Sequence, residues 1–201
     1  MKAGFEQFPL VHLRQSEACI TKRPTIVSTL LGSCISVVMI HRKSRAGGIC
    51  HALLPCCPDR TGCGRDCPEL FRYVDCSIDW MLEDFSARLG NFSGLEVKLF
   101  GGGSLIEPEQ DTYQVGVGNK NVQMARKMFK RYRINPICQD VGGYVGRKIL
   151  FYTHTGDVYV KRFGKKLFRQ AATDQRTGGK GATIDYSRIP TMPTNGTFIK
   201  K

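Results

Sequence analysis

Long hydrophobic runs are absent from this sequence. No stretch reaches the roughly 18 consecutive apolar residues that a membrane-spanning helix needs, and residues 1–6 lack the apolar core of a signal peptide. These two absences predict a cytoplasmic protein with no direct membrane insertion. Nine cysteines would indicate disulfides in an exported chain, but an odd number without an export signal predicts reduced thiols.

Acidic residues are few, because 17 Asp and Glu stand against 30 Lys and Arg and give a net charge of +13. Such an excess calls for an acidic partner, and nucleic acid is the first candidate. The basic residues do not form a recognised nucleic-acid module, so we expect no nucleic-acid partner. Residues 164–201 carry eight Lys and Arg against two Asp and show no core periodicity. We therefore predict a domain over residues 1–163 and a basic, flexible tail over 164–201.

Phosphate-binding motifs are also missing. The triple glycine 101–103 is not followed by the Lys-Ser/Thr of a P-loop and lacks the spacing of a dinucleotide fingerprint. We expect these glycines to let the backbone approach substrate or neighbouring strands closely. Together with two other glycine-containing turns they form the predicted substrate-binding set, which is Gly32, Ser33, Gly101, Gly102, Gly103, Gly142 and Gly143.

The sequence is organised around a Gly-Ser-Cys step that ends in Cys34. The apolar, β-branched runs Ile26–Leu31 and Ile35–Ile40 predict two buried strands on either side of this step. Small residues allow the backbone to turn there, and the Cys34 thiol and nearby backbone N–H groups then point at one spot. A nucleophile and an oxyanion site can be made together in this way.

A third strand from about Gly47 to Leu54 is predicted to return antiparallel through a hairpin turn centred near Ser44 or Arg45. Cys34 lies about ten residues before that centre and His51 about seven after it. Antiparallel pairing then brings thiol and imidazole within about one strand step, which is what a Cys–His pair needs. The alternative is that Cys34 is a small buried hydrophobe and His51 a satisfied core histidine.

A thiol-rich loop follows the third strand. Its four thiols, within twelve residues, are numerous enough for a zinc or iron–sulfur site. They lack the C-x₂-C pair of ordinary zinc ribbons, so we favour a loop without a ligand and expect no cofactor. If the loop holds a metal, the ligands are Cys56, Cys57, Cys63 and Cys67.

Periodicity elsewhere predicts two helices and several further strands. The first helix opens at Pro68 and ends before Gly90, and the second is capped by Asn119 or Asn121 and ends near Tyr132. Further strands are expected at Phe8–Leu13, Leu95–Phe100, Ile137–Val141, Lys148–Thr153 and Val158–Phe163, with a loop over 16–24. This order is not βαβα. It predicts an α+β fold with a mostly antiparallel, β-sandwich-like core and two main helices packed on an outer face.

Four ordered blocks carry a family resemblance. T-L-L-G-S-C-I-S-V is followed by G-I-C-H-A-L-L-P, with His51 seventeen positions after Cys34. The later blocks are L-F-G-G-G-S at Leu99–Ser104, G-N-K-N-V at Gly118–Val122 and D-V-G-G-Y-V-G-R-K-I at Asp140–Ile149. Over roughly residues 8–163 the chain resembles the CheD family, the chemoreceptor glutamine deamidases of bacterial chemotaxis.

The resemblance implies a sandwich fold similar to some toxin deamidase domains, and hydrolysis of receptor glutamines to glutamate with release of ammonia. Cys34 would be the nucleophile, as a thiolate of lowered pKa, and His51 the base. A family threonine that orients the pair corresponds to Thr29 or Ser28, which point to opposite faces of a strand. The implied partners are the cytoplasmic helices of chemoreceptors and, in some species, a CheY-phosphate phosphatase. The alternative is a non-catalytic adaptor that binds either partner.

Overall fold

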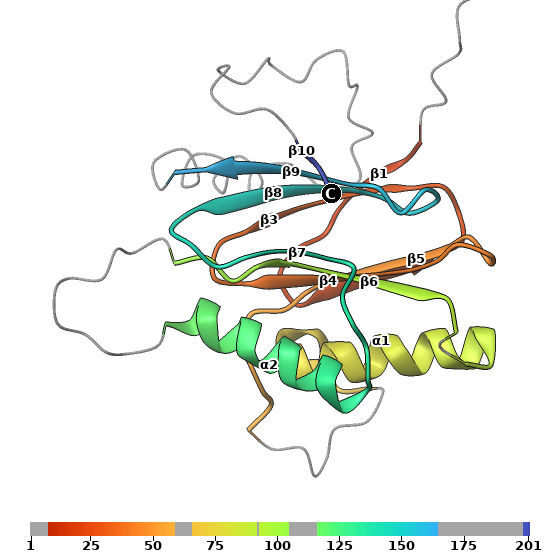
Figure 1. Cartoon of the computed structure of the whole chain (residues 1–201), viewed down its shortest axis with the longest axis horizontal. Coiled ribbons are helices and arrows are strands. Elements are labelled where there is room, and N and C mark those ends of the chain that lie inside the picture. The colour runs from red at the N-terminus through yellow and green to blue at the C-terminus, as the bar shows by residue number, and fades with distance from the viewer. Residues whose placement is uncertain (1–7, 59–65, 92, 105–115, 165–198) are drawn as a thin grey trace, which may run out of the picture.

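The computed structural model describes residues 8–58, 66–91, 93–104, 116–164 and 199–201. Two sheets are stacked face to face, and both helices lie against the outer face of one of them (Figure 1). Among the described residues, the strands form two sheets of five. One has the order β1 (Leu10–His12), β3 (Ile26–Leu31), β8 (Gly146–Tyr152), β9 (Val158–Phe163), β10 (Ile199–Lys200). The other has the order β2 (Glu17–Thr21), β5 (Ala46–His51), β4 (Ile35–His41), β6 (Leu95–Gly101), β7 (Cys138–Val141).

Most neighbouring strands pair antiparallel, and the exceptions in the described chain are β1 with β3 and β6 with β7. The helices are α1 (Val74–Leu89), preceded by the short 3₁₀ turn Leu70–Arg72, and α2 (Val117–Arg131). Both belong to the layer outside the second sheet. The predicted α+β sandwich with helices on one outer face is therefore confirmed.

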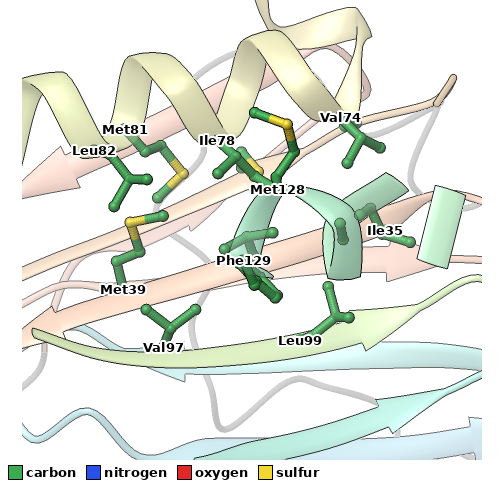
Figure 2. Packing of buried hydrophobic residues seen from close by; sticks show 14 of the residues in the cluster. Ile35, Met39, Val74, Ile78, Met81, Leu82, Val97, Leu99, Met128 and Phe129 are labelled. Carbon is green, nitrogen blue, oxygen red and sulfur yellow. The ribbon is translucent and has the colours of Figure 1, made fainter. Parts of the chain in front are cut away.

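Successive side chains of β4 point alternately into two hydrophobic cores, one on each face of the sheet. Val37 and Met39 belong to the core under the helices, whereas Val38 and Ile40 belong to the core between the sheets. Figure 2 shows Met39 among side chains of α1, and Phe129 of α2 above β6. β4 is buried on both faces, so its sequence is mainly apolar, with Ser36 as the polar interruption before His41, instead of alternating between apolar and polar residues.

Helix α1 packs on the sheet because its apolar residues recur at helical spacing. Ile78, Met81 and Phe85 are fully buried against the sheet. The helix ends where the sequence indicated, since Gly90 adopts the left-handed conformation at φ 79° and its N–H donates to Ser86 O at 2.8 Å. It begins later than predicted: Tyr73 is extended and bridges to Leu54, so the regular turns start at Val74.

Three other expectations differ from the structure. The loop expected over 16–24 contains β2, which pairs along the edge of β5. Helix α2 begins at Val117 with Gly116 as its N-cap residue, so Asn119 and Asn121 both lie inside the helix and neither caps it. The predicted tail falls mainly on 165–198, which lie outside the described residues, but its last part returns as β10 on the edge of β9. In the described ranges, no helix has the length and apolarity to cross a membrane.

Candidate active site

Cys34 and His51 lie on the same face of the β4–β5 pair. Val38 stands opposite Ile49, and Ile35 and Ala52 exchange backbone hydrogen bonds of 3.0 and 2.9 Å. Continued by one residue each way, this register sets Cys34 opposite Leu53 and makes His51 its diagonal neighbour. Diagonal pairs are roughly 7–8 Å apart at Cα, within reach of an aromatic ring. The hairpin pairing predicted from the sequence is present, and both side chains face the layer between the sheets.

Thr29 fixes the orientation of the His51 ring. Its Oγ1 lies 2.9 Å from the carbonyl oxygen of Leu13 and 2.8 Å from His51 Nδ1. The hydroxyl has one proton, which it donates to the carbonyl, so it accepts a hydrogen bond from Nδ1–H. The neutral ring therefore carries its proton on Nδ1, and the lone pair of Nε2 is left to act as a general base. In the described part of the chain Nε2 is buried without a hydrogen-bond partner.

Ser28, the other candidate hydroxyl, does not contact His51. Thr29 has the same strand parity as Val27 and Leu31, which face the core between the sheets, so Ser28 faces the other way. Its Oγ is buried and has no partner among the described atoms. The geometry favours Thr29 over Ser28 as the orienting group, a choice that the sequence left open.

Burial keeps both members of the pair neutral. It raises the pKa of Cys34 to about 11, although the residue's own backbone N–H lies against the thiol and opposes this shift. Burial also lowers the pKa of His51 to about 4, against a smaller opposing effect of the Leu13 carbonyl. The expected thiolate of lowered pKa is therefore wrong for the resting site. At neutral pH these diagonal neighbours are a thiol and a neutral imidazole, which suits proton transfer during attack better than a preformed ion pair.

The predicted glycine turns come together around Cys34. Gly103 N–H donates to Gly32 O and Gly102 N–H to Cys34 O, each at 2.8 Å. Gly142 N–H donates to Gly101 O at 2.9 Å, and Ser104 N–H to Gly143 O at 2.8 Å. The chain thus links three turns, 32–34, 101–104 and 142–143, through backbone hydrogen bonds. Gly101, Gly102 and Gly103 are buried in this network, which fits close approach to neighbouring strands.

The conformation of Gly102 also leaves one backbone N–H near the thiol, that of Cys34, without a backbone hydrogen-bond acceptor in the part of the chain that the structure describes. A regular continuation of the β4–β6 ladder would pair the Cys34 N–H with Gly102 O. Gly102 instead has φ 65°, and a Cβ there would lie 2.3 Å from a methyl carbon of Val122, so only glycine fits. As a result, the Cys34 N–H has no backbone acceptor among the described residues.

Sequence reasoning missed two polar groups that hold these turns. Arg147 is buried, donates to Asp140 Oδ1 at 2.9 Å and to Gly142 O at 2.8 Å, and so fixes the 142–143 turn. Asn121, fully buried on α2, donates to Ser33 O and Leu53 O at 2.9 and 2.8 Å. Both residues fall within the family-like blocks, and a polar residue on the apolar face of α2 was the available signal.

The thiol-rich loop is only partly described. Cys63 lies outside the described residues, Cys56 and Cys67 are free cysteines, and the Cys57 N–H donates to Asp75 Oδ1 at 3.2 Å. No group of three or more His, Cys, Asp or Glu side chains suited to a metal ion occurs in the described ranges. A metal site in this loop stays a prediction.

Several known proteins are similar to this chain over most of its length. A probable chemoreceptor glutamine deamidase, CheD 2 of Geobacter sulfurreducens, is 43% identical over 82% of this chain and 97% of its own length. The family model for CheD chemotactic sensory transduction matches residues 57–162. The chain belongs to the CheD family. Within the family, a probable chemoreceptor glutamine deamidase of Maridesulfovibrio salexigens is 40% identical over 79% of this chain and 94% of its own length.

A more distant CheD relative is found in the archaeon Thermococcus kodakarensis, at 35% identity over 71% of this chain and 86% of its own length. Among solved structures, Bacillus licheniformis hypothetical protein YfiH overlays with a TM-score of 0.41 at 14% identity, covering 62% of this chain and 49% of that one. An overlay this weak carries no argument. The matched span of the CheD model begins after His51, so the roles of Cys34 and His51 rest on geometry and chemistry.

Proposed function

We propose that this CheD family member is a chemoreceptor glutamine deamidase, which hydrolyses receptor glutamine side chains to glutamate and releases ammonia. The observation that carries the proposal is the hydrogen-bond chain from Leu13 O through Thr29 to His51, on the strand face that also bears Cys34. This hydrogen-bond chain leaves Nε2 unprotonated on the strand face that bears the Cys34 thiol. The names of the Geobacter and Maridesulfovibrio relatives support the same reaction.

In the first half-reaction Cys34 Sγ attacks the carboxamide carbon of glutamine while His51 Nε2 takes the thiol proton. The carbonyl π bond opens to a tetrahedral oxyanion. When the C–N bond breaks, the imidazolium gives this proton to the departing nitrogen, so ammonia leaves and a thioester remains on Cys34. Because the resting thiol and ring are both neutral, proton transfer accompanies attack.

In the second half-reaction water attacks the thioester and His51 Nε2 accepts the water proton. The C–S bond then breaks, the sulfur is reprotonated from the imidazolium, and glutamate is released. His51 thus acts twice with the same nitrogen. Thr29 holds the proton on Nδ1 in both steps, in the place that a carboxylate takes in serine-protease triads.

The Cys34 N–H is the proposed oxyanion donor. It lies against the thiol, and the turn at Gly102 leaves it without a backbone acceptor in the described chain. A donor of this kind strengthens its hydrogen bond as negative charge develops on the substrate oxygen. Only Cys34 N–H is assigned to this role here.

Helix α2 supplies a basic surface next to the site. It contains no Asp or Glu, and its exposed residues include Lys120, Arg126, Lys127 and Lys130. Its first turns reach the Cys34 turn through Asn121. An acidic stretch of receptor helix would be attracted to this surface and brought to the thiol, with an effect that weakens as salt is added.

Purified protein incubated with the cytoplasmic fragment of a chemoreceptor tests the proposal. Ammonia release and conversion of glutamine to glutamate in receptor peptides, measured by mass spectrometry, are expected for the wild type and absent for Cys34→Ala. Receptor binding without ammonia release would contradict the enzyme and favour the adaptor. Binding of a CheY-phosphate phosphatase without ammonia release would favour an adaptor whose partner is that phosphatase.

A further inference from the structure

The β4–β5 ladder stops beside Cys34. Its last rung joins Ile35 and Ala52, and the next closely spaced rung would give Ser33 O the N–H of Leu54. That N–H instead donates to Arg72 O at 3.1 Å, as the Leu53 N–H does at 2.9 Å. The two strands therefore separate at the point where the nucleophile is placed.

Asn121 replaces the missing rung. Its Nδ2 donates to Ser33 O at 2.9 Å and to Leu53 O at 2.8 Å. Ser33 immediately precedes Cys34, and Leu53 stands opposite Cys34 and two residues beyond His51. One side-chain amide thus joins the backbone before the nucleophile to the backbone after the base. The two acceptors also fix the amide orientation, because Oδ1 cannot face two carbonyl oxygens.

The position of Asn121 is itself fixed by close packing of α2 on the glycine turns. A Cβ on Gly118 would lie 2.6 Å from Gly102 O, so the helix backbone lies directly on the segment that bonds to Cys34 O. The residue is fully buried, and among the described atoms its Oδ1 has no hydrogen-bond partner. A buried unsatisfied acceptor costs about 1–3 kcal/mol, so stability alone does not account for an asparagine here.

We propose that Asn121 is a positioning residue of the Cys34–His51 pair. It holds the two separated strand ends at a fixed spacing, and so keeps the Cys34 thiol and N–H in register with His51. The inference rests on the proposed function for its catalytic consequence. The geometric part, a change in the surroundings of the Cys34 thiol, is measurable without any receptor.

The test compares Asn121→Ala with Met128→Ala, a substitution on the same buried face of α2 two turns further on. Both remove buried atoms and should lower the melting temperature. With Asn121→Ala we expect kcat to fall by about 10- to 100-fold with KM changed less than about threefold, because small misplacement of reacting groups is costly. Met128→Ala should leave kcat within about twofold. Equal kcat losses in the two variants would overturn the proposal.

Alkylation of Cys34 by iodoacetamide, followed by peptide mass spectrometry across pH, separates this proposal from the proposed function. Asn121→Ala should shift the pH midpoint of Cys34 alkylation relative to wild type, whereas Met128→Ala should not. An unchanged midpoint and rate in Asn121→Ala would reject the positioning role even if deamidation is never observed. If Asn121→Ala does not fold, Asn121→Ser keeps one donor and should show the same shift at smaller size, and an unshifted midpoint in it would reject the role equally.

Discussion

Cys34 and Cys50 are both buried thiols of the β4–β5 region, and burial raises the pKa of each to about 11. Cys50 faces the core under the helices, where the N–H groups of Val37 and Cys50 and the Ser77 hydroxyl partly oppose the rise in its pKa. Cys34 faces the core between the sheets, on the same side as His51. His51 follows Cys50 directly in the sequence, yet strand alternation turns it away from that thiol. The thiol pKa alone therefore does not distinguish the proposed nucleophile. What distinguishes Cys34 from Cys50 is that it shares a strand face with His51.

Replacing the two thiols in turn gives the largest expected contrast. Cys34→Ala should abolish ammonia release, because it removes the proposed nucleophile and leaves His51 without the thiol whose proton it takes. Cys50→Ala should retain activity and lose about 1–2 kcal/mol of stability through a small cavity. Ammonia assays and urea unfolding measure the two effects. Residual deamidation in Cys34→Ala would remove the distinction between the thiols.

His51→Ala should be as inactive as Cys34→Ala, and the double variant should be no worse than either, since a nucleophile and its base act as one unit. Single-turnover assays of all three variants would measure this non-additivity. Circular dichroism should show that each remains folded. Substantial activity in His51→Ala alone would assign the base to another residue.

The orienting hydroxyl should contribute less. Thr29→Val leaves His51 Nδ1–H and the Leu13 carbonyl without their partner, and we expect activity to fall by about 10- to 100-fold. Ser28→Ala, on the opposite face of the same strand, should change activity by less than about twofold. A matched loss in both variants would show that the β3 strand acts through stability and not through the ring.

The pH dependence of the thiol should show a neutral resting pair. A pKa of about 11 means that Cys34 alkylation still rises between pH 9 and 10, past the ~8.5 of a free cysteine. The low pKa of His51 means that kcat/KM stays flat as pH falls through 6.5 and drops only toward 4, where the base is protonated. An alkylation plateau below the value for free cysteine would instead show a preformed thiolate–imidazolium pair.

Removing a segment far from both thiols should have the smallest effect on activity and stability. Lys98 Nζ donates to Gly156 O and Lys201 O, each at 2.9 Å, and β10 adds a short edge to β9. Ending the chain at Gly164 should lower stability by about 1 kcal/mol, or roughly 2–4 °C in Tm, with the turnover of Cys34 unchanged. Scanning calorimetry and the ammonia assay check both parts. A collapse of folding would show that the residues after 164 are part of the core.

Local pattern was sufficient for much of the architecture. The apolar runs gave β3 and β4 within a residue, and Gly90 ended α1 as predicted. The hairpin turn lies within about one residue of its expected centre, which brings Cys34 and His51 to one face. β2 was missed because it is a partly exposed edge strand whose apolar run, Ala18–Ile20, is only three residues long.

Residue order alone predicts that one strand pair presents a cysteine and a histidine together, because antiparallel register follows from turn position and a two-residue side-chain period. Packing between distant segments places Thr29, and not Ser28, against the ring, since that contact depends on the carbonyl of Leu13, which follows β1. It also decided that Asn121 reaches the strand ends from a helix 87 residues after Cys34 in the chain. Such contacts depend on packing between segments distant in the sequence, which local periodicity does not encode.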